Sequence, residues 1–276
     1  MSRIIGIDVG GSTTKIVGLH GNNIFSPLLV KANDPIASIY GAFGKFMSEN
    51  KLSLKDINRV MVTGAGSSYI SEALYGIPTG KVDEFHAIGK GGLFLTKLDR
   101  AIIVSMGTGT AYVIADRCGE KHIGGTGVGG GTLLGLSNKM LNIRHFDDLI
   151  EMAQGGNLAN IDLHISDIMK NKLENLPPEI TASNFGKISD LATKADTALG
   201  IINLVFQTIG TIAIFASRIH DTKDIVLTGN LTNVPQSRDI FDALQRLYQV
   251  RFHIPDHAEF ATATGAALLP AGELPA

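Results

Sequence analysis

The chain has 276 residues, of which 44% are hydrophobic and 18% are charged. This balance excludes an intrinsically disordered protein and allows about two domains. The formal net charge is −2 and the sequence pI is about 6.4, so the broad cationic field of nucleic-acid-binding or membrane-surface proteins is missing. The single cysteine, Cys118, excludes an intrachain disulfide and a multi-cysteine metal site and fits a reducing, cytoplasmic location.

Two segments bear on a membrane or secretory role. The N-terminal segment reaches an acid, Asp8, before an apolar signal-peptide core could form, so we expect no secretory signal. The stretch between Asp196 and Arg218 carries no charge over nearly the length of a membrane span. Polar residues and two glycines interrupt this stretch and no basic cluster flanks it, so we expect a helix buried in the protein and no membrane partner.

The first part of the chain predicts a three-stranded antiparallel meander, a helix and a further strand. Apolar runs over residues 3–8, 15–20 and 23–30 are strand-like and are separated by short turns. Apolar residues at helical spacing over residues 35–50 predict a crossover helix. Residues 59–63 are typical of a buried strand, which can add to the meander in parallel.

The second part repeats this order in outline. A predicted strand over residues 101–105 leads into a Gly/Thr-rich turn at 107–110, and a second strand follows over 111–115, which indicates a second hairpin built like the first. Helical periodicity extends from residue 133 to about 217, with breaks at a glycine pair and a proline pair. Three further elements are a strand, an amphipathic helix and a helix of small residues, over residues 225–230, 238–248 and 261–269.

The charged stretch over residues 97–100 is the predicted waist between two units. We expect an N-terminal lobe over residues 1–98 and a C-terminal lobe over 99–276. The last helix, at about 260–272, is expected to pack back on the N-terminal lobe, because its small residues permit close helix packing.

Glycine is the compositional outlier, with 32 of 276 residues, and it clusters where apolar runs end. The segment Asp8-Val9-Gly10-Gly11-Ser12-Thr13-Thr14-Lys15 puts a carboxylate at a strand end, followed by backbone amides and hydroxyls in a tight turn. Such a turn suits phosphate oxygens, and the carboxylate suits a hydrated Mg²⁺; an ordinary hairpin turn is the alternative. The glycine run over residues 124–131 enters a helix and offers amides to an anion. Neither segment is a P-loop or a dinucleotide fingerprint.

Glu84 is the candidate general base. It stands beside the apolar Phe85 at a predicted element boundary, where a carboxylate can accept a proton from a substrate hydroxyl. Asp83 and His86 would be its solvated neighbours. Phosphoryl transfer needs phosphate binding, Mg²⁺ and one base that aligns the attacking oxygen, and these motifs together supply that set.

The order of these motifs resembles that of type II pantothenate kinases over nearly the whole chain. The resemblance rests on Asp8-x-Gly-Gly-Ser-x-x-Lys15, Asp83-Glu84-Phe85, the turn at 107–110, the glycine run at 124–131, the segment at 181–186 and Gly265-Ala266-Ala267. Those kinases belong to the superfamily of acetate and sugar kinases, heat-shock 70 proteins and actin. The resemblance therefore implies an α/β fold of two ribonuclease-H-like lobes, mixed sheets flanked by helices, ATP in the interlobe cleft, and a homodimer.

The resemblance also implies roles for individual residues. Glu84 would be the catalytic base on the primary hydroxyl of pantothenate, and Asp8 would organise Mg²⁺. The residues expected at the nucleotide are Asp8, Val9, Gly10, Gly11, Ser12, Thr13, Thr14, Lys15, Thr108, Gly130, Gly131, Thr132, Leu133, Leu134, Phe146 and Asn230. The residues expected at the acceptor are Thr108, Thr110, His122, Thr181 and Ala182, the last two contributed by the other subunit.

One position departs from the family pattern. His122, preceded by Lys121, stands where relatives generally have Arg in the substrate pocket. Arg is a fixed cation, whereas His is mostly neutral at pH 7 unless its pKa is raised. The acceptor or its affinity can therefore differ; either Lys121 compensates or His122 is a surface residue.

The function implied is ATP- and Mg²⁺-dependent phosphorylation of pantothenate to 4′-phosphopantothenate, the first step of coenzyme A biosynthesis. Two alternatives stay open: a kinase of a related small alcohol such as pantetheine, and a non-catalytic ATP-binding module of the same superfamily. The superfamily also includes ATPase activators of radical dehydratases, which use paired cysteines for a cluster at the dimer interface. A single Cys118 argues against that activity.

Overall fold

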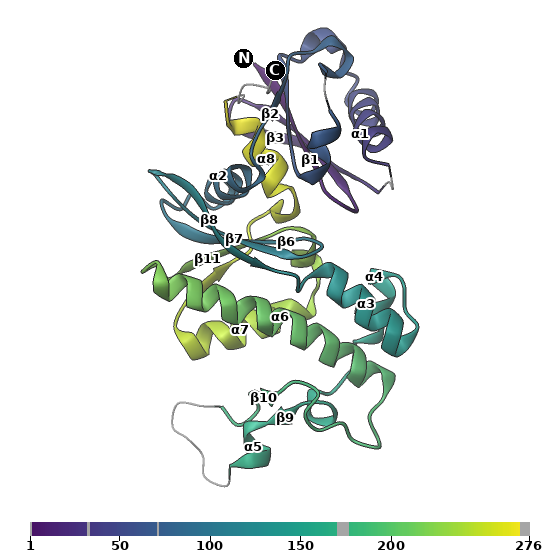
Figure 1. The fold of residues 1–276 in the computed structure, drawn as a ribbon, viewed down its shortest axis with the longest axis vertical. Helices are drawn as coiled ribbons and strands as arrows, with labels where there is room; N and C mark the ends of the chain where they lie inside the picture. Colours follow the sequence, from purple (N-terminus) through teal and green to yellow (C-terminus); the bar gives the residue numbers. More distant parts are fainter. Residues whose placement is uncertain (1, 32–33, 71, 170–176, 271–276) are drawn as a thin grey trace.

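The computed structural model describes residues 2–31, 34–70, 72–169 and 177–270. Two five-stranded mixed sheets follow one another along its long axis (Figure 1). The first has the order β3-β2-β1-β4-β5, with β1 (Arg3–Val9), β2 (Thr14–His20), β3 (Asn23–Val30), β4 (Arg59–Thr63) and β5 (Thr79–Lys81). The second has the order β12-β11-β6-β7-β8, with β6 (Ala101–Met106), β7 (Thr110–Asp116), β8 (Gly119–Thr126), β11 (Asp224–Thr228) and β12 (Arg251–His253).

The two sheets have the same topology. In each, three consecutive strands form an antiparallel meander, and two later strands add in parallel beside the first strand. The expected architecture of two mixed sheets flanked by helices is therefore confirmed.

Helices separate and cover the sheets (Figure 1). The outer face of the first sheet packs on α1, and the second sheet buries its far face against α6, α3, α4 and α7. Between the sheets, α8 packs on the first and α2 on the second. The bounds are α1 (Pro35–Glu49), α2 (Glu84–Thr96), α3 (Gly130–Leu141), α4 (Phe146–Met152), α5 (Ile165–Ile168), α6 (Lys194–Ile219), α7 (Gln236–Tyr248) and α8 (Ala261–Leu268).

Side chains along β1 alternate between the two faces of the sheet, so this strand contacts a helix on each side. Ile5 and Ile7 are fully buried in the cluster that faces α1. Successive strand residues point to opposite faces, so Gly6 and Asp8 face α8. A Cβ atom added at Gly6 would lie only 2.0 Å from the Ala263 carbonyl oxygen, which shows how closely α8 approaches the strand. The end of β1 therefore presents Asp8 to the space between the sheets.

The helices α2 and α8 cross in backbone contact. A Cβ added at Gly91 would lie 1.9 Å from the Ala261 carbonyl oxygen, and one added at Gly265 would lie 1.8 Å from the Ala87 carbonyl oxygen. On both helices the small residues are four positions apart and share one face. This contact ties α2, which begins at Glu84, to α8 on the first sheet. The division of the chain at residue 98 stays a prediction, because α2 precedes it yet packs on the second sheet.

Helical structure is predicted from residue 133 to about 217 with breaks at 155–156 and 177–178, but in the described part of the segment between these breaks only Ile165–Ile168 are α-helical. After α4, the short strands β9 (Leu163–His164) and β10 (Thr181–Ser183) and the helix α5 form a small unit, which Figure 1 shows beyond α6. We call residues 157–169 and 177–193 the β9–β10 unit. The pairs at 155–156 and 177–178 break the helical pattern, and hydrogen bonds to buried carboxylates replace helical ones.

The glycine run and the long apolar stretch also have defined structures. The first residues of the run belong to β8, and its last two begin α3. Among the described residues, α6 is the helix that has the length and apolarity of a membrane span, but most of it is buried in the core of the second half. The expectation of a buried helix is confirmed.

Candidate functional site

A buried ion pair lies at the end of the first hairpin. Asp8 in β1 pairs in register with Lys15 in β2, and their Oδ2 and Nζ atoms are 3.6 Å apart. The two residues are only 6% and 7% exposed. Burial raises the pKa of Asp8, and the charge of Lys15 offsets only part of that effect. A carboxylate in this state gains from a second cation, so Asp8 fits a hydrated Mg²⁺.

Two residues beside Asp8 were not predicted as site residues. Thr63 ends β4 in register with Asp8, and within the described part of the chain its buried hydroxyl has no hydrogen-bond partner. Gly64 follows with φ of 86°, and a Cβ there would lie 2.7 Å from Asp8 Oδ1. The conformation and the close approach both require glycine. The Gly64-Ala65-Gly66 sequence at the end of a predicted strand was the available signal.

Glu84 belongs to the same electrostatic site. It is the first residue of α2, and the Asp83 side chain caps the helix by accepting from the Phe85 and His86 amides at 2.9 and 3.1 Å. Its side chain stays accessible, yet surrounding protein removes enough water to raise its pKa. The charges of Asp8 and then Asp83 raise that pKa further, whereas Lys15 lowers it.

The side chains at the turn between β1 and β2, and at the strand ends beside it, point in two directions. The Gly10 amide closes it by donating to the Thr13 carbonyl oxygen at 3.0 Å. Val9 is buried in the α1-facing core, and the Thr14 hydroxyl accepts from Ser38 of α1 at 2.6 Å, so these two side chains lie away from Asp8. The remaining turn residues, Gly11, Ser12 and Thr13, are at least partly accessible.

The turn between β6 and β7 is hydrogen-bonded to the glycine run over residues 124–131. The amides of Gly130 and Gly131 donate to the carbonyl oxygens of Gly107 and Thr108, both at 2.9 Å. A Cβ at Gly129 would lie 2.7 Å from the Thr108 oxygen, so the two segments meet backbone to backbone. The idea that the whole run offers free amides to an anion needs correction, because these two amides bind protein carbonyls.

Other predicted residues around this turn are split between packing and hydrogen bonding. Thr110 donates to the Val128 carbonyl oxygen at 2.8 Å, and Thr132 donates to Gly127 at 3.0 Å. Leu133 is fully buried, and Phe146 packs against the same core from the start of α4. Leu134, the next residue along α3, is half-buried.

One hydrogen bond joins predicted site residues from the two halves. Asn230, which follows β11, donates from Nδ2 to the Thr13 hydroxyl at 3.4 Å. Its Oδ1 atom is buried and lacks a hydrogen-bond partner among the described residues. The preceding Gly229 has φ of 90° and donates to Ala258. The structure therefore brings the first turn, Asp8, Lys15, Glu84 and Asn230 to the space between the sheets.

His122 lies beside the base. Its ring stacks on Phe85, with centroids 3.9 Å apart and planes inclined by 17°, and Phe85 follows Glu84. His122 pairs with Val113, whose side chain packs with α2, whereas Lys121 pairs with Ile114 in the α6-facing core. Strand alternation therefore directs Lys121 to the opposite face.

Thr181 and Ala182 do not approach Glu84 within one chain. They belong to β10, which Figure 1 shows beyond α6, whereas α2 lies on the other side of the second sheet. The Thr181 hydroxyl donates to Asp162 at 3.0 Å, and Ala182 is exposed.

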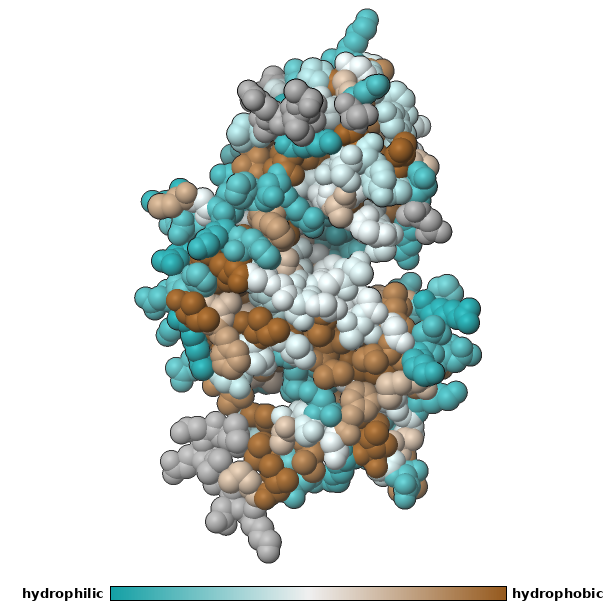
Figure 2. Space-filling view, viewed as in Figure 1, coloured by the Kyte–Doolittle hydropathy of each residue, from teal (hydrophilic) through white to brown (hydrophobic). Residues whose placement is uncertain are grey.

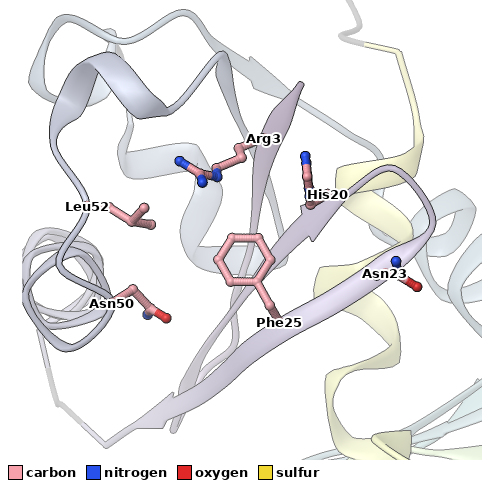
Figure 3. A pocket seen from close by; sticks show the side chains of 6 residues that line it. All are labelled: Arg3, His20, Asn23, Phe25, Asn50 and Leu52. Atoms are coloured by element: carbon pink, nitrogen blue, oxygen red, sulfur yellow. The ribbon is translucent and has the colours of Figure 1, made fainter. Parts of the chain in front are cut away.

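Other concave or ligand-like features do not add to the site. Figure 3 shows a hollow of about 320 Å³ on the first half, lined by Arg3, His20, Asn23, Phe25, Asn50 and Leu52. The Arg3 guanidinium there pairs with Asp56 at 3.6 Å, and Asn50 accepts from Ser26. Within the described residues, no three His, Cys, Asp or Glu side chains gather as a metal cluster.

Similarity to solved structures establishes the fold. The activator of 2-hydroxyisocaproyl-CoA dehydratase from Clostridium difficile, solved with bound ADPNP, matches with a TM-score of 0.68 at 18% identity over 96% of this chain and 93% of that one. The ROK hexokinase from Thermus thermophilus matches with a TM-score of 0.56 at 12% identity over 96% and 97%. The fold is therefore that of the actin-like ATPases, as expected from the resemblance.

Sequence relatives establish the family. A family model described as Fumble matches residues 100–268. A type II pantothenate kinase of Staphylococcus epidermidis is 29% identical over 275 residues, covering 96% of this chain and 99% of that protein. One from Bacillus cereus is 33% identical over 204 residues, covering 68% and 67%. The chain belongs to the Fumble family, together with these type II pantothenate kinases.

Proposed function

We propose that the chain is an ATP-dependent kinase that transfers a phosphoryl group to pantothenate, giving 4′-phosphopantothenate for coenzyme A biosynthesis. The observation that carries this proposal is the raised pKa of Glu84 in the field of Asp8, with Lys15 beside them. A carboxylate with a raised pKa is suited to remove a proton near neutral pH. The adjoining ion pair and turn supply the charge and hydrogen bonding that a triphosphate needs.

The nucleotide would lie between the two turns. The amides of residues 11–13 and the hydroxyls of Ser12 and Thr13 would bind phosphate oxygens, together with Lys15, Thr108 and Asn230. Leu134, Thr132 and Phe146, at the starts of α3 and α4, would border the nucleotide. Asp8 would hold Mg²⁺ through water, and the orphan hydroxyl of Thr63 beside it supports such a wet, polar pocket. When bound, Mg²⁺ would neutralise charge on the phosphate oxygens.

Glu84 would act on the acceptor. Its carboxylate takes the proton of the primary hydroxyl, the hydroxyl oxygen bonds to the terminal phosphorus, and the bond to the ADP oxygen breaks. Lys15 lies next to Asp8 and would face the phosphates. Thr110 and His122 would line the acceptor pocket from the same chain.

A second copy would complete the acceptor pocket with Thr181 and Ala182. The helix α6 supports a homodimer, because its Phe215 and Ile219 side chains are 54% and 79% exposed. Figure 2 shows brown, apolar atoms gathered over the middle of the molecule, where α6 runs in Figure 1. We also propose a cytoplasmic location, since both substrate classes are intracellular metabolites.

Pantetheine is the second candidate acceptor. His122 stacks on Phe85 beside the base and carries no fixed charge, while Lys121 belongs to the opposite strand face. Beside His122, a neutral acceptor would therefore lose less binding free energy than an acceptor whose carboxylate needs a permanent cation.

A coupled ATP-consumption assay with pantothenate and pantetheine side by side tests the proposal. Glu84→Gln should abolish turnover while ATP binding and folding persist, and Glu120→Gln, a carboxylate change on neighbouring β8, should keep turnover. Wild-type turnover by Glu84→Gln would remove Glu84 as the base. Tight ATP binding without turnover on either alcohol would instead favour the non-catalytic ATP-binding module.

A further inference from the structure

Asp162 is a fully buried carboxylate at which α6 meets the β9–β10 unit. Its Oδ2 atom accepts from Asn203 Nδ2 at 2.7 Å and from the Thr181 hydroxyl at 3.0 Å. Asn184 Nδ2 lies at 3.4 Å from the same oxygen, and the Phe185 amide donates to Oδ1 at 2.9 Å. One side chain thus holds the first residue of β10, the two residues that follow this strand and a residue in the middle of α6.

In the described part of the chain, the charge of Asp162 has no ionic partner. Within the described residues no Lys, Arg or His forms a salt bridge with it, and only neutral groups donate to it. Burying a carboxylate without a cation costs free energy that an apolar residue would not cost. Stability alone therefore does not explain this carboxylate, whereas a requirement for a fixed geometry does.

The network fixes the hydroxyl of Thr181. An ionised carboxylate can only accept, so the Thr181 hydrogen points at Asp162. Asn203 Nδ2 lies 3.2 Å from the Thr181 oxygen and donates to it. One lone pair of that oxygen remains, so Thr181 can meet a ligand only as a hydrogen-bond acceptor, and the ligand group must be an N–H or O–H donor.

We propose that Asp162 is a positioning residue that orients Thr181 as a hydrogen-bond acceptor for a donor group of the substrate alcohol. The inference rests on the proposed function, in which Thr181 and Ala182 enter the acceptor pocket of a second copy. The group recognised is an amide N–H or a hydroxyl, because a carboxylate has no hydrogen to donate to Thr181.

Asp162→Asn tests this with little change of volume. The new amide places donors against the donors already at this site, so Thr181 loses its fixed orientation. We expect the KM for the acceptor to rise up to about ten-fold, as for the loss of one hydrogen bond between neutral groups, while the KM for ATP stays unchanged. The control is Asp167→Asn on the same unit, where the carboxylate pairs with Lys187 near the surface; both KM values should keep their wild-type values.

A double-mutant cycle separates the positioning of Thr181 by Asp162 from a general loss of structure. Thr181→Val removes the hydroxyl and should raise the acceptor KM as much as Asp162→Asn, and the double variant should raise it no further. Thr181→Ser should restore the wild-type KM. If Asp162→Asn does not fold, Asn203→Ala replaces it, because it removes one donor from both Asp162 and Thr181. Additive effects, or an equal loss in the ATP KM, would overturn the inference.

Mixed dimers test the contribution in trans. When Asp162→Asn chains are co-expressed with Glu84→Gln chains, one pocket combines an intact Glu84 with an intact β10 from the partner. That pocket should show the wild-type acceptor KM. If every active pocket keeps the raised KM, β10 does not act across the dimer and the inference fails.

Hydrogen exchange distinguishes this failure from failure of the proposed function. If the wild-type protein phosphorylates neither pantothenate nor pantetheine, the proposed function fails whatever Asp162 does. Positioning is then read from the backbone amides of residues 181–186, which should exchange faster in Asp162→Asn than in Asp167→Asn. Unchanged exchange in both variants would overturn the positioning role itself.

Discussion

The substitution Gly265→Ala is expected to displace Glu84, the proposed base, without contacting its side chain. A methyl group there would lie 1.8 Å from the Ala87 carbonyl oxygen, and Cβ contacts below 3.0 Å are essentially never seen. The helices α2 and α8 must therefore separate by at least 3.0 − 1.8 = 1.2 Å at this point. The obstacle is backbone, so no change of rotamer relieves it. Glu84 lies one helical turn before Ala87 and moves with it.

The size of the effect follows from that displacement. A misplacement of about 1 Å at a reacting group can cost about 100-fold in rate, so we expect kcat/KM to fall between about 10-fold and 100-fold. Overpacking should lower the unfolding free energy by about 1–3 kcal/mol, which chemical denaturation measures. Gly44→Ala is the control, because Gly44 is exposed in α1 and has no described atom within 4 Å of its added Cβ; it should stabilise the protein by about 0.5–1 kcal/mol. Wild-type kcat/KM and stability in Gly265→Ala would refute the link between the helix crossing and Glu84.

Three other outcomes are expected. Because burial, Asp8 and Asp83 raise the pKa of Glu84, kcat/KM should fall on acidification at a higher pH than for an ordinary glutamate. Asp83→Asn keeps the helix cap and should move the acidic limb of the pH profile of kcat/KM to lower pH. An unmoved acidic limb would contradict the assignment of this limb to Glu84. Hydrogen bonds from Thr193, Asn157 and Asn160 hold the pKa of Asp196 at about 2, so its stabilising effect is present above pH 3.8 and is lost as the pH falls through about 2. Asp196→Asn should flatten the dependence of the unfolding free energy on pH in that window, as followed by denaturant titration; an unchanged slope would exclude this contribution. His122→Arg should increase kcat/KM for pantothenate relative to pantetheine, and an unchanged ratio would show that residue 122 does not meet the acceptor carboxylate.

Long apolar runs made the frame of the fold predictable. The strands β1, β2, β4, β6 and β7 are short apolar runs that are buried over most of their length. The helices α1 and α7 bury apolar residues at helical spacing. The strands β5, β10 and β12 have three residues each, which is too short for a period to appear. The strand β8 was hidden because its second half reads as a glycine-rich loop.

The site was predictable where residues are close in sequence and not where tertiary contacts set their surroundings. Asp8 and Lys15 face each other because they belong to one hairpin. The orphan hydroxyl of Thr63 depends on a parallel pairing 55 residues away in sequence, and the donors around Asp162 come from elements that only the folded chain assembles. Sequence pattern alone carries no signal for such many-body contacts.

The matching topology of the two sheets gives the molecule a built-in asymmetry of chemistry. Strand β6 leads into its turn as β1 does, and Gly229 after β11 repeats the positive φ of Gly64 after β4. At the place of Asp8, however, β6 has Ser105, which pairs with Ala111 and not with a lysine. The two turns therefore differ in charge: the one after β1 lies beside a buried ion pair, and the one after β6 follows a neutral pair of residues. We expect this difference to favour one orientation of an elongated anion bound between the sheets over the reverse orientation.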